Sequence, residues 1–232
     1  MRVEVLAHTP EPERVVALAA RLCYSEAGVK TLLGRLDRTE VARLIDLLQE
    51  RGHESPFEHA SFTFAIEGIS RACSHQLVRH RLASFSQQSQ RWVSMRRAEF
   101  VVPPSVARDG RAKEVFEGFL EQAESAYRTL VALGVPREDA RYVLPNACTT
   151  RLVLTMNARE LLHVFRLRCC QRSQWEIRAL AYMMLKKCRE VAPLLFARAG
   201  APCDVDGSCP EKDYSCPRWK RSPTPRPGEA RP

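Results

Sequence analysis

The spacing of apolar residues constrains the fold of this 232-residue chain more than any other feature. Long segments carry apolar residues three and four positions apart, the period of an amphipathic helix, whereas alternation typical of a strand is confined to short segments. Phe62, Phe64 and Ile66 alternate with small or polar residues and predict a half-buried strand. Shorter strands are predicted over 3–7 and 150–155. The pattern indicates a helix-rich α+β fold with a small mixed or antiparallel sheet.

Capping residues indicate where the helices begin. Asp37 with Glu40, and Asn157 with Glu160, are capping-box patterns, in which the first side chain accepts a backbone hydrogen bond three residues later. Gly52 is placed to end the first of these helices, and the second is expected to reach about residue 170. The remaining helices are predicted from Thr9-Pro10 through 22, from Ser70 to Arg81, and over 111–133, 137–144 and 174–199.

The composition changes beyond Gly200, where the chain becomes rich in Pro, Gly and Cys and is predicted to lack a core of its own. We therefore expect one domain over residues 1–199 and a tail over 200–232. No run of about eighteen apolar residues predicts a membrane span, and the N-terminus does not resemble a signal peptide. Nine cysteines at scattered spacings favour a reducing compartment, so a cytoplasmic protein is expected.

Three tail cysteines leave one alternative open. Cys203, Cys209 and Cys216 are separated by five and six residues and could bind zinc. Structural zinc sites usually show CxxC pairs and four ligands, so reduced thiols without a metal are the preferred interpretation.

The net charge of +9 is concentrated in two arginine-rich segments. Residues 70–98 contain six arginines and no acidic residue, and residues 159–178 contain five arginines against Glu160 and Glu176. Arginine favours bidentate recognition of phosphate or carboxylate groups. A solvated basic face, nucleic-acid binding and a small anionic ligand are all compatible with the charge alone.

The chain lacks several common nucleotide-site and catalytic motifs. It has no P-loop, no GxGxxG after a strand, no GxSxG and no HExxH. On the helix predicted from Ser70, Gln76 would share a face with Arg79 and His80. The following stretch, 82–91, is dense in Ser and Gln and ends in Arg91, which suits a loop that binds phosphate and sugar groups. A solvated polar loop is the alternative.

One motif resembles a known family. Arg79-His80-Arg81 is followed by seven residues and then Ser89, a pattern similar to that of flavin-dependent thymidylate synthases. The resemblance extends over about 3–199, through the segments 52–59, 135–145, 157–159, 167–168 and 174–177. It implies a homotetramer with active sites at subunit contacts. It also implies reductive methylation of dUMP to dTMP with methylenetetrahydrofolate as carbon donor and NADPH as reductant through FAD.

The resemblance also implies roles for individual residues. The flavin cofactor FAD would contact Ser55, Arg79, His80, Arg81, Gln87, Asn157, Arg159 and His163. The nucleotide dUMP would contact Gln76, Arg79, Gln87, Gln88, Ser89, Gln90, Arg91, Arg141 and Arg168. Arg168 matches the family's uracil-facing arginine and is expected to be catalytic by stabilising negative charge on the ring. No metal is expected.

Two residues depart from the family pattern. Gln87 stands where many members have Glu, which removes a charge but keeps an acceptor, and His163 stands where some have Asn. Asn157 is also a plausible helix cap, and Arg141 could pair with Glu138 or Asp139. A nucleic-acid-binding protein that uses the arginine segments remains the alternative function, although it does not explain the 79–91 spacing.

Overall fold

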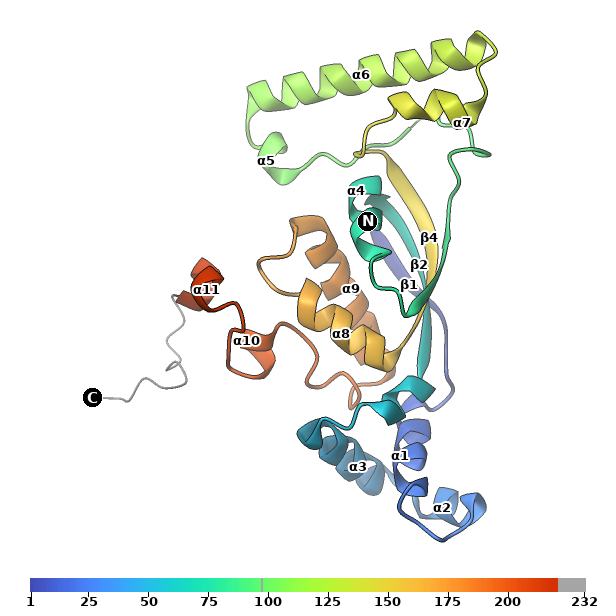
Figure 1. The fold of residues 1–232 in the computed structure, drawn as a ribbon, viewed down its shortest axis with the longest axis vertical. Coiled ribbons are helices and arrows are strands. Elements are labelled where there is room, and N and C mark those ends of the chain that lie inside the picture. The colour runs from blue at the N-terminus through green and yellow to red at the C-terminus, as the bar shows by residue number, and fades with distance from the viewer. Residues whose placement is uncertain (97, 221–232) are drawn as a thin grey trace, which may run out of the picture. The chain divides into compact units, whose positions relative to one another are not determined.

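The computed structural model describes residues 1–96 and 98–220 (Figure 1). Arg97, one of the six arginines of the first basic segment, and residues 221–232 of the predicted tail lie outside this description. The strands are β1 (Arg2–His8), β2 (Ser61–Ser70), β3 (Ala83–Gln87) and β4 (Thr149–Asn157). The α-helices are α1 (Pro12–Leu22), α2 (Val29–Arg35), α3 (Arg38–Arg51), α4 (Arg71–Leu77), α5 (Pro104–Ala107), α6 (Gly110–Ala132), α7 (Arg137–Ala140), α8 (Ala158–Arg168), α9 (Trp175–Val191), α10 (Pro202–Val205) and α11 (Pro217–Lys220). Three 3₁₀ helices are η1 (Ser55–His59), η2 (Arg141–Val143) and η3 (Lys212–Tyr214).

The strands form one small antiparallel sheet in the order β1-β2-β4-β3, and the chain is otherwise helix-rich, as expected for an α+β fold. The chain divides into two compact units that are interleaved in sequence. The first unit contains residues 1–2, 65–79 and 85–154. The second contains 3–64, 80–84 and, of the described residues, 155–220. The expected division into a domain over 1–199 and a tail stays a prediction.

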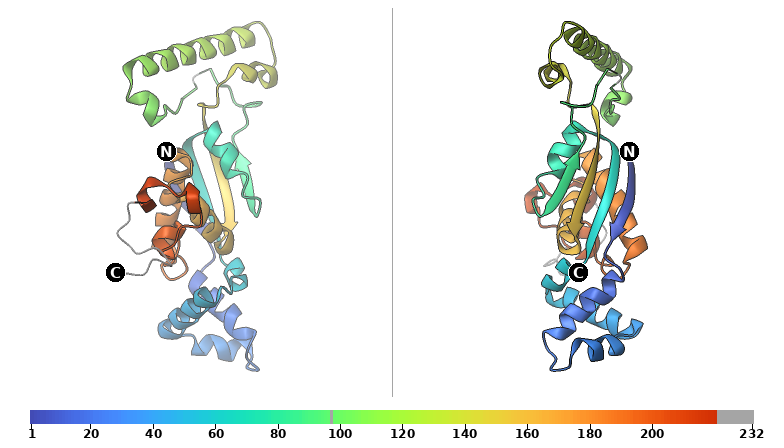
Figure 2. Two further views of the ribbon diagram at one scale, coloured as in Figure 1. Left: turned by 60° about the vertical axis from the view of Figure 1, so that its left-hand side comes forward. Right: turned by 90° about the vertical axis from the view of Figure 1, so that its right-hand side faces the viewer.

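The first unit is organised by the long helix α6, which begins where Asp109 accepts hydrogen bonds from the backbone of Arg111 and Ala112. Helix α7 lies beside it (Figure 2). Tyr127 of α6 is fully buried with Met95 and Ala140, and its hydroxyl accepts a hydrogen bond from the Met95 backbone nitrogen. This contact fixes the irregular segment after residue 88 against the helix.

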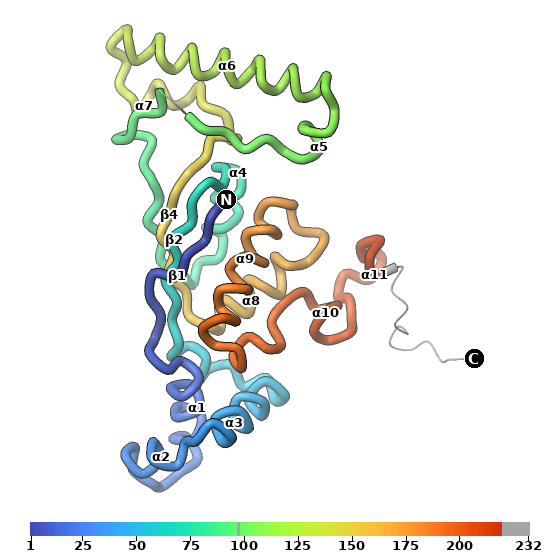
Figure 3. The backbone as a smooth tube through the Cα atoms, turned by 180° about the vertical axis from the view of Figure 1, so that it is seen from behind, coloured from blue at the N-terminus to red at the C-terminus, as the bar shows by residue number. Residues whose placement is uncertain are grey.

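The second unit packs α1 against α3, and α8 against α9 (Figure 3). Its core includes Phe62, Phe165 and Phe196, with Phe196 edge-on to each of the other two rings. Gln49 of α3 donates hydrogen bonds to the carbonyls of Leu194 and Leu195, which attaches the segment after α9 to the same core.

Several predicted boundaries are wrong. Helix α4 ends at Leu77 and not at Arg81, because the chain tightens into a turn in which the Arg79 backbone nitrogen bonds to the Gln76 carbonyl, three residues earlier. Gln76, Arg79 and His80 therefore do not share a helical face. Helix α9 ends at Val191 and not at 199, because Pro193 disfavours a helical residue before it. The first helix begins at Pro12 rather than at Thr9-Pro10.

Several elements, most of them only three to five residues long, were not predicted. The polar stretch expected as a loop contains β3, in which Ala83, Phe85 and Gln87 are half-buried and the serines between them are exposed. Its alternation is concealed because most of these side chains are small or polar. Helix α2 was also missed.

Among residues 1–96 and 98–220, none of the helices combines the length and the apolar character that a membrane crossing requires.

Candidate active site

His80 is the buried residue of the Arg79-His80-Arg81 motif, and its side chain makes contacts with other elements. Its side chain is 4% exposed, whereas Arg79 and Arg81 are exposed on either side of it. In the second unit, His80 lies against one face of α8, which contributes Glu160, His163 and Arg168. Helix α8 is set by its cap, since the Asn157 side chain accepts a hydrogen bond from the Glu160 backbone nitrogen, as predicted.

Both ring nitrogens of His80 face protein groups. Arg168 Nε donates a hydrogen bond of 2.9 Å to His80 Nε2, and Glu160 Oε1 lies 3.4 Å from Nδ1. The ring of His163 stands edge-on at 6.0 Å between centroids. Because Nε2 accepts, the ring proton is on Nδ1, on the side of the Glu160 carboxylate. Contact between His80 and a flavin would therefore use its backbone or ring face.

The environment keeps the His80 imidazole neutral. Burial, with smaller contributions from Arg168 and His163, lowers the pKa of His80 to about 4. Burial also raises the pKa of the Glu160 carboxyl. At neutral pH His80 is an uncharged acceptor, and Arg168 carries the positive charge of the group.

Arg79 and Arg81 differ from Arg159, the third arginine predicted to bind the cofactor, in whether their guanidinium groups already have partners. Within the described part of the chain, the guanidinium groups of Arg79 and Arg81 have no hydrogen-bond or ion-pair partner. Arg159 is instead bound by two carboxylates from the segment around η1, Glu58 and Glu54, with 3.4 Å between its Nε and Glu54 Oε2. An anionic ligand can thus bind Arg79 or Arg81 without displacing a carboxylate, but it would compete with Glu58 and Glu54 for Arg159.

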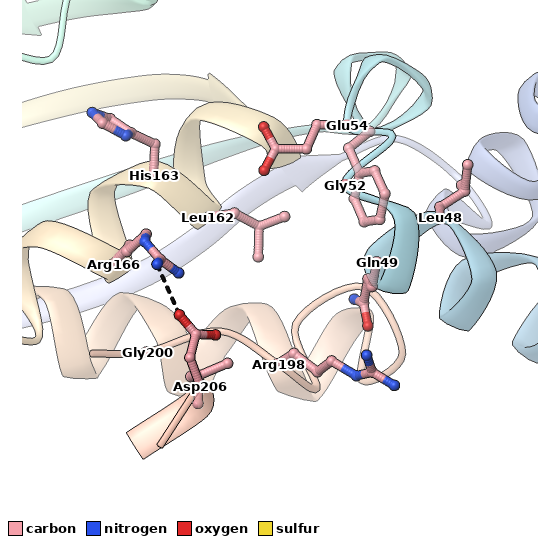
Figure 4. Close-up of a pocket in the computed structure, with 12 residues that line it drawn as sticks. Leu48, Gln49, Gly52, Glu54, Leu162, His163, Arg166, Arg198, Gly200 and Asp206 are labelled. Atoms are coloured by element: carbon pink, nitrogen blue, oxygen red, sulfur yellow. Dashed lines mark ion pairs between the residues drawn. The ribbon is translucent and has the colours of Figure 1, made fainter. Parts of the chain in front are cut away.

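A cavity of about 460 Å³ lies in the second unit (Figure 4). Glu54, His163 and Arg166 line it, together with Asp206 from beyond α10. Arg166 pairs with Asp206 at 2.8 Å. Ser55, another predicted cofactor residue, is exposed at the start of η1, directly after Glu54. The sequence did not single out Arg166 or Glu54, because their partners are far away in the chain.

In the first unit, Gln87 is anchored by its amide nitrogen. Gln87 Nε2 donates to Ser74 Oγ at 2.9 Å and to Thr150 Oγ1 at 3.0 Å, and both hydroxyl-bearing residues are buried. The amide oxygen of Gln87 has no such partner among the described residues. This arrangement presents an oriented acceptor.

Arg91 and Arg141 are linked through Glu138. The Arg91 guanidinium pairs with the Glu138 carboxylate at 2.7 Å and lies over the ring of Trp92. Arg141 Nε donates to the Glu138 backbone carbonyl at 3.0 Å, so the predicted alternative of carboxylate pairing is replaced by a backbone contact. Ser89 Oγ accepts a hydrogen bond from the Arg91 backbone nitrogen. The structure therefore brings Ser89, Arg91 and Arg141 into one connected group.

The remaining residues predicted to bind the nucleotide make fewer side-chain hydrogen bonds. The side chain of Gln76 donates to the Ala72 carbonyl of its own helix at 3.4 Å. Gln88 bonds through its backbone nitrogen to the Arg151 carbonyl, and Gln90 is half-buried.

Arg71, at the start of α4, is a candidate that no motif in the sequence singles out. Its side chain is half-buried, and no carboxylate among the described residues pairs with it. Burial, followed by the nearby charge of Arg141, lowers the pKa of Arg71. Two cations held close together favour an anion between them. The absence of acidic residues from 70–98 was the available signal.

No three His, Cys, Asp or Glu side chains in residues 1–96 and 98–220 are grouped so that they could hold a metal ion. None of the nine cysteines, all of which lie within the described residues, forms a disulfide bond.

Comparison with known proteins decides the family. Residues 4–194 match the family described as "Thymidylate synthase complementing protein". The chain belongs to this family. The resemblance seen in the sequence is thereby confirmed, and nothing in the comparisons supports the nucleic-acid alternative.

Several relatives are similar to the chain over nearly its whole length. A protein of Geobacter sulfurreducens is 55% identical, with 93% of this chain and 94% of the relative covered. A protein of Nitratidesulfovibrio vulgaris is 51% identical, with 94% and 95% covered. One of Clostridium tetani is 46% identical, with 93% of each covered. All three are named flavin-dependent thymidylate synthase.

Proposed function

We propose that this chain is a flavin-dependent thymidylate synthase that converts dUMP to dTMP, with methylenetetrahydrofolate as carbon donor and NADPH as reductant through FAD. The observation that carries the proposal is the family match over 4–194, which includes the whole Arg79–Ser89 motif. We further propose a homotetramer in the cytoplasm, where the nine cysteines, none of which is in a disulfide, would stay reduced.

The two arginines of the Arg79-His80-Arg81 motif fit a cofactor with a diphosphate. The guanidinium of Arg81 is exposed and unpaired among the described residues, as is that of Arg79 two positions earlier. Such groups suit bidentate binding of phosphate oxygens. We assign Ser55, Arg79, His80, Arg81, Gln87, Asn157, Arg159 and His163 to FAD binding. When bound, FAD would supply the redox chemistry, taking a hydride from NADPH and providing reducing equivalents for the methylene carbon.

The polar groups of the first unit suit a nucleotide. Hydroxyl, amide and guanidinium donors for the phosphate and sugar of dUMP come from Gln76, Arg79, Gln87, Gln88, Ser89, Gln90, Arg91 and Arg141. The Glu138 carboxylate holds Arg91, so phosphate binding there would shift or share this ion pair. The two hydroxyl contacts of Gln87 Nε2 leave its oxygen to accept from a ribose hydroxyl or a flavin group.

Arg168 is proposed as the catalytic residue. Bond formation at uracil C5 requires negative charge to develop on the ring carbonyls and N3. A guanidinium can meet two acceptors in one plane, and a donor fixed in advance at such a position stabilises the transition state. Arg168 is the last residue of α8, where the C-terminal helix dipole also favours a cation.

The proposal predicts that the purified protein binds FAD. The protein should be reconstituted with FAD, desalted, and examined for flavin absorbance, and the small molecule released on denaturation should be identified. We expect FAD to be retained and released as such. The double variant Arg79→Ala/Arg81→Ala should bind less FAD, whereas Arg43→Ala, a surface arginine paired with Glu40, should bind it normally. Wild-type protein that retains no flavin would refute the proposal.

A further inference from the structure

Arg168 is held by its Nε alone. The donor bond to His80 Nε2 at 2.9 Å uses the single N–H at the inner end of the guanidinium. Among residues 1–96 and 98–220, neither Nη of Arg168 has a hydrogen-bond or ion-pair partner. Because the guanidinium is planar, fixing the Nε–H direction restricts the plane in which both Nη groups lie. The two outer nitrogens therefore remain available to a ligand, in an orientation that His80 selects.

The acceptor that holds Arg168 is uncharged. Arg159, on the same helix, is bound by the carboxylates of Glu58 and Glu54, which compensate its charge. Arg168 is bound by an imidazole whose environment keeps it neutral, so its positive charge is not compensated by its anchor. A group that stabilises developing negative charge is most effective when it is fixed in place but not already neutralised.

Glu160 and His163 in turn hold the His80 ring. Glu160 Oε1 lies 3.4 Å from Nδ1 and favours the tautomer with the proton on that nitrogen, which leaves Nε2 as the acceptor. The edge-on ring of His163 packs against His80 at 6.0 Å. Because Glu160 and His80 are both buried, with side chains 8% and 4% exposed, the contact has little freedom to rearrange.

We infer that His80 is a positioning residue, which holds the guanidinium of Arg168 by its Nε without neutralising it, so that both Nη groups can bind one acidic planar ligand. The identity of that ligand as the uracil ring of dUMP rests on the proposed function. The role of His80 in the reaction is thus exerted through Arg168, and Glu160 selects the tautomer that makes it possible.

Two substitutions separate this role from packing. His80→Gln places an amide oxygen where it can accept from Arg168 Nε, whereas His80→Leu fills a similar volume without an acceptor. We expect His80→Leu to lower kcat for dTMP formation by about 10- to 100-fold, the effect of losing a hydrogen bond to a charged group. We expect His80→Gln, which keeps an acceptor for Arg168 Nε, to recover most of the turnover that His80→Leu loses. His75→Leu, at an exposed histidine of α4, is the matched control and should have parental activity.

A second measurement does not depend on activity. In protein labelled with ¹⁵N-arginine, the Arg168 Nε–H resonance can be assigned by its loss in Arg168→Lys, and its exchange with water can be measured. We expect slow exchange in the parent and in His80→Gln, and at least tenfold faster exchange in His80→Leu. Circular dichroism and bound flavin should be recorded for each variant, so that loss of fold or cofactor is recognised.

The outcomes are distinguishable. Parent protein that makes no dTMP but shows the protected Arg168 Nε–H would refute the proposed function and leave the positioning contact supported. Equal exchange in the parent and in His80→Leu would overturn the inference. So would a His80→Leu protein that loses flavin but turns over normally per bound flavin, since His80 would then act on the cofactor and not on Arg168.

Discussion

Gln87 is held by the nitrogen of its side-chain amide. This contact determines how its replacement should affect ligand binding and turnover. Its nitrogen donates to Ser74 and Thr150, while its oxygen is left as an acceptor. One such hydrogen bond contributes about 0.5–1.5 kcal/mol net. Gln87→Ala should therefore weaken dUMP or FAD binding roughly tenfold and leave saturated turnover within a similar factor. Gln87→Glu keeps an oxygen acceptor but removes the N–H donors to Ser74 and Thr150, so its binding should lie between those of the parent and Gln87→Ala. Binding by calorimetry and turnover at saturation check this, and collapsed turnover with unchanged binding would contradict it.

For single residues, it was easier to predict which residue belongs to the site than which residue it contacts. The spacing from Arg79 to Ser89 is a local pattern, and it is enough to single out His80. The partner of His80 is Arg168, 88 positions away, and one partner of Arg159 is Glu58, 101 positions away. Local patterns carry no information on such pairs, because the pairs depend on how α8 packs in the folded unit.

Among the elements, helix starts were predicted best because a cap is local. Asp37 and Asn157 each accept the predicted hydrogen bond from the backbone nitrogen three residues later. Strand β3 was missed because its alternation involves serines and a glutamine. The end of α4 was misplaced because the turn after Leu77 contains no Gly or Pro that would mark it in the sequence. The sequence thus predicted elements with strong apolar periodicity and missed those whose limits depend on tertiary contacts.

Asn157 combines a cap with a proposed cofactor contact, and the two roles can be separated. Loss of a cap costs about 1 kcal/mol, so Asn157→Ala should lower the free energy of unfolding by that amount without FAD, much as Asp37→Ala should on α3. Asn157→Asp keeps the cap and should keep the stability. If Asn157 also contacts FAD, Asn157→Ala should in addition lower FAD affinity, whereas Asp37→Ala should not. Denaturant unfolding and flavin titration measure the two effects, and equal FAD affinity in all three variants would limit Asn157 to its role as a cap.

For the whole molecule, α8 itself supports a shared active site. Arg159 and Arg168 are nine residues apart on this helix and so project about 180° apart at about 100° per residue. The two side chains also have different partners: Arg159 binds Glu54 and Glu58, and Arg168 binds His80. This is consistent with side chains that project in different directions from the helix. One compact ligand can hardly use both arginines of one copy, so we predict that different copies supply them to each site. Light scattering of the FAD-loaded protein should give four times the chain mass, and a monomer with full activity would contradict this.

The central claim, dTMP formation with Arg168 activating the uracil ring, is tested most directly by comparing the parent with Arg168→Lys. Both proteins are reconstituted with FAD and supplied with dUMP, methylenetetrahydrofolate and NADPH, and dTMP is quantified by chromatography. Lysine keeps the charge but cannot meet two ring acceptors in one plane. We expect the parent to form dTMP and Arg168→Lys to form it a hundredfold or more slowly, a loss of about 3 kcal/mol in transition-state stabilisation. Oxidation of NADPH by flavin and oxygen should continue in the variant. A parent that forms no dTMP, or an Arg168→Lys protein within about threefold of the parent rate, would contradict the account.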